Sequence, residues 1–504
     1  MKRAILVSLY EAACLAGQIV YFLFWGYYFG TSPEMDAYWV SATLPMILIA
    51  VFTEPLVASL VPILVERRLK APQADIEDFQ NNLFNLTLLA GGLLTLLLCA
   101  GAGVVTRLLA PGLPPATRAL AESLLRIRAI SLPLRLSAGL LTSFYYARER
   151  YYLPTAMPAF GTAAAIIFLV LFQGSMGIYA LAWSSLFEAL VQWVPLIPIM
   201  RRYSPKFRPR DPGLRKLASS MLPLVGGSAY FKSDSLVDRI VASFLPAGSI
   251  SSLGYGFRMA SAVNQVISRG FITTRFKELA EHRISSAPEF RKSVNRLILQ
   301  VVYVTVPCLI TLFLFIRPLI SFFLERGRFT GLDTARVASI ILAFSGMILF
   351  GLLGSIMATC FYSIQDTKSL TLIGVVVFTL GIGLKILGAA SFSYLGVAAA
   401  TSVYYFLAFA AQMIVFQRKT GVFEFAGLAS ATLRMATAGA ATFAAGLFLR
   451  RWAVPDMARI LLGIGLVFSL YFAATLALGV DEPRNLWRKA RGFALRRGGN
   501  SRSG

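Results

Sequence analysis

The stretch LILQVVYVTVPCLITLFLFI, at positions 297–316, contains no charged residue and is flanked by Arg296 and Arg317. It is long enough for an α-helix to cross the hydrocarbon core of a bilayer, which takes about 20 apolar residues. Similar runs recur from end to end of the 504 residues, of which 57% are hydrophobic and only 14% charged. Together with a mean hydropathy of +0.68, this composition predicts a polytopic, all-α membrane protein.

Windows of about 20 residues predict about fourteen transmembrane helices. These spans lie near residues 4–28, 37–64, 83–106, 124–147, 153–173, 178–200, 217–244, 249–270, 297–316, 337–361, 370–388, 394–416, 432–449 and 458–478. The first run follows Lys2 and Arg3 as a secretory signal does, but it continues to about Tyr28 and carries Glu11. We therefore interpret it as an uncleaved span.

Basic residues in alternate loops predict the orientation of the chain. They gather at Arg67, Arg68 and Lys70, at Arg148 and Arg150, at Arg201, Arg202, Lys206, Arg208 and Arg210, and at Arg275, Lys277 and Arg283. Because positive loops stay in the cytoplasm, both termini of the chain are expected on the cytoplasmic side of the membrane. The formal net charge of +24 mostly reflects this bias and a basic tail that can contact anionic lipid.

The sequence argues against several other classes of protein. No Gly-x-x-x-x-Gly-Lys-[Ser/Thr] loop occurs, so the chain is not expected to be an ATP-driven pump. The sole histidine, His282, lies in a basic loop, which argues against an integral-membrane enzyme. Without a soluble domain no nucleic-acid partner is expected. The four cysteines lie within spans without paired spacing, so no metal, cofactor or disulfide is expected.

Charged side chains inside the predicted spans indicate where function lies. A charge at that depth must face protein or water, so these residues predict a polar cavity within the membrane. The candidates are Glu54, Lys232, Asp234, Asp238, Arg239, Arg258 and Lys385. For Lys232 and Asp234 the alternative is a structural ion pair. Glu54 could couple transport to protons or satisfy backbone groups freed by Pro55. For Arg135 and Glu188 we favour snorkelling or pairing over a function.

A shift of about 217 residues aligns features of the two halves, such as the turns at 147–150 and 364–367 after the fourth and tenth spans. This repeat predicts a six-helix lobe at 1–210, a second six-helix lobe at 211–420, two additional helices at 421–480 and the basic cytoplasmic tail at 481–504. An offset of six spans keeps the repeats parallel, so we expect a pseudo-twofold axis along the membrane normal.

Several segments resemble the bacterial lipid II flippases, the MurJ/MviN group of the multidrug/oligosaccharidyl-lipid/polysaccharide exporter superfamily. They include DAYWVSATLP at 36–45, LLAPG at 108–112, VDRIVAS at 237–243 and, most specifically, ERGRFT at 325–330. The resemblance implies two lobes that flip a polyprenyl-linked saccharide by alternating access. It adds Asp36 to the candidate cavity residues. Glu325, Arg326 and Arg328, in the ERGRFT stretch, are most simply an outer gate or a loop clasp. For the span at 432–449, rich in Ala and Gly, close helix packing and a groove for the polyprenyl tail remain open.

The chain also departs from that family's pattern. Arginines usual in the first two spans are absent, whereas Arg258 keeps a matching cationic position. With Lys232 and Arg239 it could hold a pyrophosphate, and the departure favours a substrate other than lipid II or altered coupling. Where some members bind sodium, the nearest positions are Gly381, Lys385 and Thr401. A cation needs oxygen ligands, so we expect Lys385 to replace sodium and to pair with Asp234 or Asp238.

Three functions follow from these observations. The first is a flippase for a polyprenyl-pyrophosphate-linked saccharide, either a peptidoglycan precursor or a surface polysaccharide unit. The second is a small-molecule or drug antiporter of the same superfamily. The third is a transport-inactive membrane scaffold, in contact with proteins of cell-wall or polysaccharide synthesis. Membrane lipids are expected partners in each case.

Overall fold

The computed structural model describes residues 2–200, 202–285, 287–450 and 457–483, and within these ranges it contains helices and no strand. The chain divides into two compact units. Unit 1 is Met1–Ser251 together with Arg326–Thr330, and unit 2 is Ser252–Glu325 together with Gly331–Gly504. The predicted tail at 481–504 lies almost entirely outside the described residues. The all-α architecture expected from composition is confirmed.

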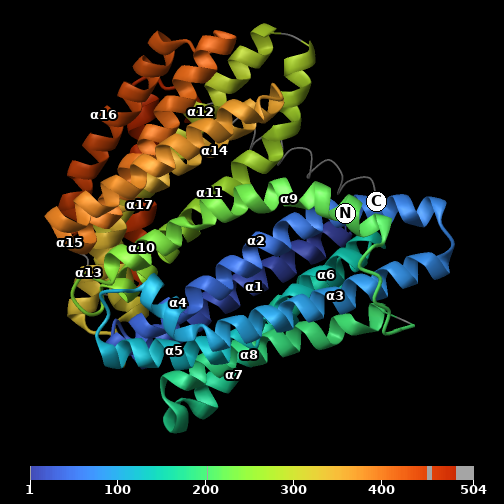
Figure 1. Ribbon diagram of the computed structural model, residues 1–504. Coiled ribbons are helices and arrows are strands. Elements are labelled where there is room, and N and C mark those ends of the chain that lie inside the picture. Colours follow the sequence, from blue (N-terminus) through green and yellow to red (C-terminus); the bar gives the residue numbers. More distant parts are fainter. Residues whose placement is uncertain (1, 201, 286, 451–456, 484–504) are drawn as a thin grey trace, which may run out of the picture. The chain divides into compact units, whose positions relative to one another are not determined.

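Unit 1 is a bundle whose long helices run side by side (Figure 1). Its helices are α1 (Lys2–Phe29), α2 (Pro33–Lys70), α3 (Gln73–Ala100), α4 (Ala102–Leu109), α5 (Pro115–Ala129), α6 (Leu132–Ala147), α7 (Tyr152–Met176), α8 (Ile178–Trp193), the 3-10 helix η1 (Val194–Ile199), α9 (Pro212–Lys232) and α10 (Asp234–Ala242). The α2 helix begins where the Ser32 hydroxyl accepts the N–H of Met35 at 3.2 Å. Pro33 follows in the first turn, where its lack of a backbone N–H costs nothing. Ser32 and Pro33 together therefore favour a helix start at this point.

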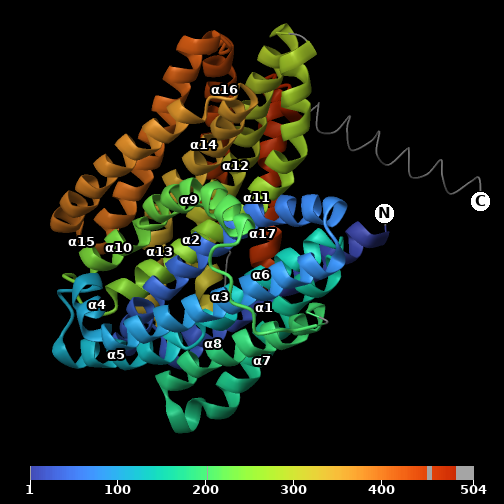
Figure 2. The same cartoon turned by 45° about the vertical axis from the view of Figure 1, so that its right-hand side comes forward.

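Unit 2 contains the second set of long helices, and α12, α14 and α16 run alongside one another in both views (Figure 2). Its helices are α11 (Ser249–Ser285), which begins in unit 1, α12 (Ala287–Leu324), α13 (Gly331–Ala343), α14 (Ser345–Ser363), α15 (Thr367–Thr420), α16 (Phe425–Arg450) and α17 (Met457–Ala477). The core of unit 2 gathers apolar side chains of α12, α14, α16 and α17, including Val301, Ile356, Met435 and Val467.

The α15 helix is a hairpin of two arms, as the two predicted spans at 370–388 and 394–416 require. The backbone leaves helical geometry at Phe392 and Ser393, where Ser393 has a φ of 56°. Beside this turn Gly388 and Gly396 approach so closely that a Cβ on Gly396 would lie 1.8 Å from the Gly388 carbonyl oxygen. Only glycine fits such a backbone contact. At the open end of the hairpin, Lys419 pairs with Asp366.

Helices occupy all the predicted spans, to within a residue or two, but several of the helices are broken. Among the described residues, nine helices are long and apolar enough to cross a membrane. This number is smaller than the predicted count partly because α15 holds two spans. The span at 124–147 divides into α5 and α6, and the span at 217–244 divides at Ser233 into α9 and α10. The chain is a multi-pass membrane protein.

Turns of the same geometry recur at nearly the predicted shift of the internal repeat. Gly248 follows Gly30 by 218 positions, and both have positive φ. Gln365 follows Glu149 by 216 positions, and Ser393 follows Gly177 by 216, again with positive φ at each residue. These pairs support two repeats of similar structure. The boundaries predicted for the two lobes remain a prediction, because the compact units are defined by contacts and not by the repeat.

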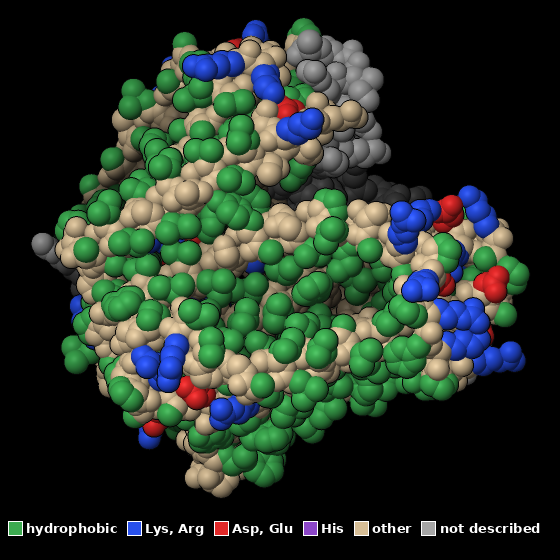
Figure 3. Space-filling view, viewed as in Figure 1, with side chains coloured by type: hydrophobic (Ala, Val, Ile, Leu, Met, Phe, Trp, Pro, Cys, Tyr) green, Lys and Arg blue, Asp and Glu red, His purple; other side chains and the backbone are tan. Residues whose placement is uncertain are grey.

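The surface of unit 1 has the distribution of side chains expected for contact with lipid. Figure 3 shows hydrophobic side chains across the middle of the bundle, with Lys and Arg gathered near the ends of helices. Large apolar side chains of unit 1 are exposed, among them Leu96 (68%) and Leu171 (70%). Exposed leucine over so wide an area suits a hydrocarbon environment and not water.

Candidate functional site

The sequence predicted Asp36 as a cavity residue, and the structure places it in a buried cluster at the beginning of α2. The Asp36 side chain is 2% exposed. Its carboxylate accepts the backbone N–H of Gly248 at 2.6 Å and that of Ser251 at 2.7 Å. Both donors lie at the N-terminus of α11, where unpaired N–H groups and the helix dipole favour an anion. Asp36 therefore fixes the start of α11 against α2.

Arg239 belongs to the same cluster. It is 8% exposed, and its NH1 donates to the carbonyl oxygen of Ile250 at 3.1 Å. Its guanidinium lies 5.1 Å from the ring centroid of Trp39, and Asp36 and Asp238 attract it electrostatically. We call Asp36, Arg239, Gly248 and Ser251 the Asp36 clasp. The clasp gives both ionised side chains partners within unit 1.

Glu54 and Lys232 form a second charged feature of unit 1, which is exposed whereas the Asp36 clasp is buried. Their side chains approach to 3.3 Å between Oε1 and Nζ, from the middle of α2 and from the last residue of α9. The Glu54 side chain is 66% exposed and the Lys232 side chain 42%. Charges on apolar spanning helices must face water or other protein. We call these two residues the exposed pair.

The acids Asp234 and Asp238 begin the short helix α10, directly after the break at Ser233. They are four residues apart and therefore share a helix face, and both are half-buried. The break lets the Ser233 hydroxyl donate to the carbonyl of Tyr230 at 2.5 Å. The predicted cavity residues on α9 and α10 thus fall into separate clusters. Lys232 pairs with Glu54, whereas Arg239 belongs to the Asp36 clasp.

In unit 2 the candidate residues lie on α11 and on the two arms of α15. Arg258 is partly exposed, two turns into α11. Lys385 is fully buried, and its Nζ lies 5.4 Å from the ring centroid of Tyr404 on the other arm. The Thr401 hydroxyl donates to the carbonyl of Val397 at 3.0 Å within its own helix. The predicted pairing of Lys385 with Asp234 or Asp238 would join the two units and stays a prediction.

The predicted outer gate lies on the connection from α12 to α13, where all three charged residues are exposed. Glu325 accepts the hydroxyl of Thr334 at 2.9 Å within unit 2. The next residues, Arg326–Thr330, group with unit 1. There Arg328 pairs with Glu34 at 3.1 Å, and its backbone N–H donates to the carbonyl of Tyr27 at 2.9 Å. The segment Arg326–Thr330 is therefore anchored on the end of α1 and the start of α2.

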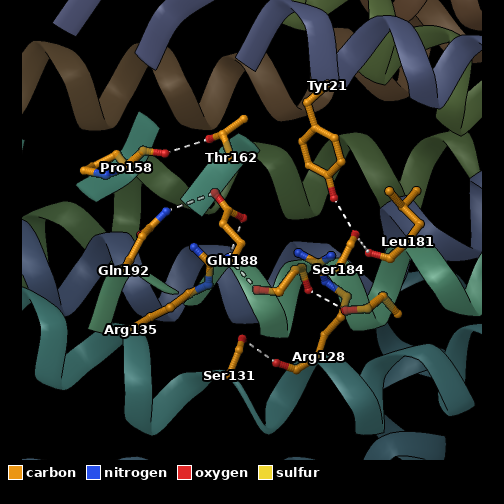
Figure 4. Close-up of polar contacts among 12 residues, drawn as sticks. Tyr21, Arg128, Ser131, Arg135, Pro158, Thr162, Leu181, Ser184, Glu188 and Gln192 are labelled. Atoms are coloured by element: carbon orange, nitrogen blue, oxygen red, sulfur yellow. Dashed lines mark hydrogen bonds and ion pairs between the residues drawn. The ribbon is translucent and has the colours of Figure 1, made fainter. Parts of the chain in front are cut away.

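Sequence reasoning missed a polar network inside unit 1, shown in Figure 4. Arg135 of α6 pairs with Glu188 of α8 at 2.8 Å, a partnership that the sequence did not indicate. The hydroxyls of Tyr21 and Ser184 lie 2.6 Å apart. Arg128, not singled out from the sequence, is 9% exposed and donates to the Tyr38 hydroxyl at 2.6 Å. An arginine at this depth was itself the signal that could have marked the network.

No group of histidine, cysteine or acidic side chains that could hold a metal occurs in the part of the chain that the structure describes. Within unit 1 the structure brings together two sets of predicted residues, the Asp36 clasp and the exposed pair. Arg258 and Lys385 belong to unit 2.

Comparison with known proteins identifies the family. The sequence profile of the family described as "Lipid II flippase MurJ" matches residues 25–463. The chain belongs to the lipid II flippase MurJ family. A curated relative from Vibrio cholerae, named probable lipid II flippase MurJ, is 29% identical over 308 residues, which is 58% of each chain. A Thermotoga maritima relative of the same name is 25% identical over 386 residues, 76% of this chain and 78% of its own.

The matched region spans 58% of the length of the Vibrio cholerae relative and 46% of that from Haemophilus influenzae. A solved structure described as "Lipid II flippase MurJ, inward closed conformation" matches with a TM-score of 0.82 at 21% identity, covering 96% of this chain and 99% of that one. An inward-facing multidrug resistance transporter of the MATE family matches with a TM-score of 0.67 at 12% identity over 82% of this chain. These two structures establish the fold.

Proposed function

We propose that this chain is a flippase that moves a polyprenyl-pyrophosphate-linked saccharide across the bacterial inner membrane by alternating access. Family membership and the names of the relatives favour lipid II as the first substrate to test. The observation that carries the proposal is the exposed pair, because Glu54 and Lys232 place accessible charge on membrane-spanning helices. Such charge is expected to line a water-filled path.

The positive groups Lys232 and Arg258 are the proposed contacts for the anionic headgroup. A pyrophosphate taken out of water needs several cationic donors, of which guanidinium gives bidentate contacts and ammonium a compact charge. Glu54 holds Lys232 in place when no substrate is bound, and Asp234 and Asp238 keep the positive charge of this region balanced. We assign Asp36 and Arg239 to supporting the fold, because both are buried in the clasp.

We also propose that both termini are cytoplasmic and that Glu325, Arg326 and Arg328 act at the outer gate. The basic residues that end α2, Arg67, Arg68 and Lys70, support this orientation. The anchoring of Arg328 on Glu34 and Tyr27 supports the gate, because it fixes the segment Arg326–Thr330 to the end of α1 and the start of α2.

The antiporter alternative has weaker support than the flippase. The similarity to the multidrug transporter covers 82% of this chain at a TM-score of 0.67, against 96% and 0.82 for the lipid flippase structure. The scaffold alternative differs from the flippase in one testable respect, since a scaffold does not need the charged residues of a transport path.

Complementation separates the flippase from the scaffold. We expect the chain to restore growth to a bacterium depleted of its own lipid II flippase, and a variant with Lys232, Asp234 and Arg258 all changed to alanine to fail. The matched control changes Glu289, Lys292 and Lys368 to alanine, because these three exposed residues carry the same charges. Each variant is quantified in the membrane by immunoblot. Growth restored by the first variant at equal abundance would support the scaffold.

The substrate is tested by direct assay. Purified chain in proteoliposomes should translocate lipid II, and addition of an excess of an unrelated cationic drug should leave that rate unchanged. Transport of the drug with no transport of lipid II, or of any other polyprenyl-pyrophosphate-linked saccharide, would instead support the antiporter.

A further inference from the structure

A cavity of about 280 Å³ lies in unit 2, where the ends of α12, α16 and α17 meet. Asn295 and Leu299 of α12 line one wall, Glu424 and Arg434 border the start of α16, and Asp481 and Glu482 follow α17. We call this the α17-end cavity. It is far along the sequence from Lys232 and Glu54, and none of the predicted cavity residues lines it.

The cavity lies at the level where apolar helices become polar, as at a membrane surface. Arg291, Lys292 and Arg296 precede the uncharged stretch at 297–316, and Asp481 and Glu482 follow the apolar helix α17. By the proposed orientation this is the cytoplasmic surface. Phospholipid headgroups lie at this level of the membrane, so a headgroup is the ligand expected next to the cavity.

Asn295 lines the cavity and carries a buried hydrogen-bond acceptor. Its Nδ2 donates to the carbonyls of Arg291 at 2.9 Å and Val422 at 3.0 Å. These two acceptors fix which end of the amide is the nitrogen, since a carbonyl cannot accept from an amide oxygen. The Oδ1 atom is buried and finds no hydrogen-bond partner among the described residues. An acceptor of this kind calls for an N–H or O–H donor.

Glu482 is a second buried acceptor on the same cavity. Its side chain is only 6% exposed, and no other described residue donates a hydrogen bond to it. Burial raises the pKa of its carboxyl, and Arg296 opposes that rise from a distance. A positively charged donor that entered the cavity would stabilise the carboxylate more directly.

At the mouth of the cavity the charges have both signs. Glu424 and Asp481 are exposed acids. Arg434 is also exposed, and its NH1 nitrogen donates to the carbonyl oxygen of Gly479 at 3.4 Å. The remaining guanidinium protons are available to an anion. The arrangement therefore matches a ligand with an ammonium at its tip and a phosphate behind it.

We propose that the α17-end cavity binds the headgroup of a zwitterionic phospholipid with a primary ammonium, such as phosphatidylethanolamine. The ammonium donates to Asn295 Oδ1 and to the carboxylate of Glu482, and the phosphate lies against Arg434. The acyl chains then follow the apolar surfaces of α16 and α17 into the membrane. Phosphatidylcholine has the same phosphate but no N–H donor, so the site is expected to discriminate against it.

The experiment compares lipids that differ only in the headgroup. Full-length chain, delipidated in detergent, is titrated with phosphatidylethanolamine, phosphatidylcholine and phosphatidylglycerol of identical acyl chains, and the bound lipid is counted by native mass spectrometry. We expect one phosphatidylethanolamine to bind at least about fivefold more tightly than phosphatidylcholine, the ratio that one net hydrogen bond supplies. Equal affinity for the two, or tighter binding of phosphatidylglycerol, would overturn the proposal.

Two substitutions assign the contacts. Glu482→Gln should lower the preference for phosphatidylethanolamine, because it removes the charge that the ammonium meets but leaves Asn295 in place. Arg434→Gln should weaken phosphatidylethanolamine and phosphatidylcholine by the same factor. Glu289→Gln and Arg418→Gln, at exposed residues outside the cavity, serve as matched controls. A preference that Glu482→Gln leaves unchanged would contradict the assignment. Because lipid binding is measured without transport, its failure is distinct from failure of the proposed function.

Discussion

The Asp36 clasp and the exposed pair look alike in the sequence and differ completely in the structure. Asp36 and Glu54 are both acids within the same helix, α2. Asp36 is 2% exposed and accepts two backbone N–H groups, whereas Glu54 is 66% exposed and meets one lysine. A charge within an apolar span thus marks either a fastening of the fold or an accessible polar surface. Its hydrogen-bond partners decide which.

The largest effect is expected from Asp36→Ala. The substitution leaves the N–H groups of Gly248 and Ser251 buried without an acceptor and Arg239 without one of its anions. Each such loss costs about 1–3 kcal/mol, so the free energy of unfolding should fall by roughly 3 kcal/mol or more. Thermal unfolding of the purified protein in detergent, followed by tryptophan fluorescence, measures the change.

Two controls belong to this measurement. Glu54→Ala removes an acid from the same helix, but its exposed ion pair is worth only about 1 kcal/mol or less. Asp36→Asn keeps one acceptor oxygen, so its unfolding temperature should lie between those of Asp36→Ala and the parent chain. If Asp36→Ala and Glu54→Ala have the same unfolding temperature, the distinction between the clasp and the exposed pair is wrong.

A smaller effect on stability, but a large one on transport, is expected at the exposed pair. The double variant Glu54→Lys with Lys232→Glu keeps an ion pair and moves the ammonium from α9 to α2. If Lys232 contacts the substrate anion, the transport rate should stay about tenfold or more below that of the parent chain, the loss of one charge-assisted hydrogen bond. Translocation of a fluorescent lipid-linked saccharide in proteoliposomes gives the rate.

The matched control exchanges the charges of Glu66 and Lys70, a 3.0 Å ion pair near the end of the same helix. That exchange also removes the 2.6 Å pair between Glu66 and Lys216. It should still leave transport unchanged and lower stability by about 1 kcal/mol at most, because these ion pairs are exposed. Full recovery of transport in the double variant at Glu54 and Lys232 would show that the two residues serve only to pair with each other.

The spans were predictable from sequence and the partners of the charges were not. Length and hydropathy are local properties, so the positions of helices such as the two arms of α15 follow from the sequence near them. The contact between Gly248 and Asp36 joins residues 212 positions apart, and that between Lys232 and Glu54 joins residues 178 apart. Whether a charge is buried depends on such long-range packing, which periodicity does not contain.

The missed residues follow the same rule. Arg128 was visible as an arginine within a predicted span, but only the packing of α5 against α2 shows its bond to Tyr38. Asn295 looks like an ordinary polar residue before an apolar run. Its amide becomes informative only when the carbonyls of Arg291 and Val422 fix its nitrogen and leave its buried oxygen without a partner, in a residue that lines a cavity.

The smallest expected effect concerns Lys385, which is fully buried as Asp36 is, but is a cation. The family resemblance places Lys385 and Thr401 near the positions where some members bind sodium, and we predict that the Lys385 ammonium takes the place of the ion. Replacing sodium by choline on both sides of the proteoliposome membrane should therefore change the transport rate by less than about twofold. The same is expected when the ions are exchanged for the Lys385→Met variant. Transport that stops in choline would show that sodium binds at oxygens elsewhere, and that Lys385 is a buried structural charge of the same kind as those in the Asp36 clasp.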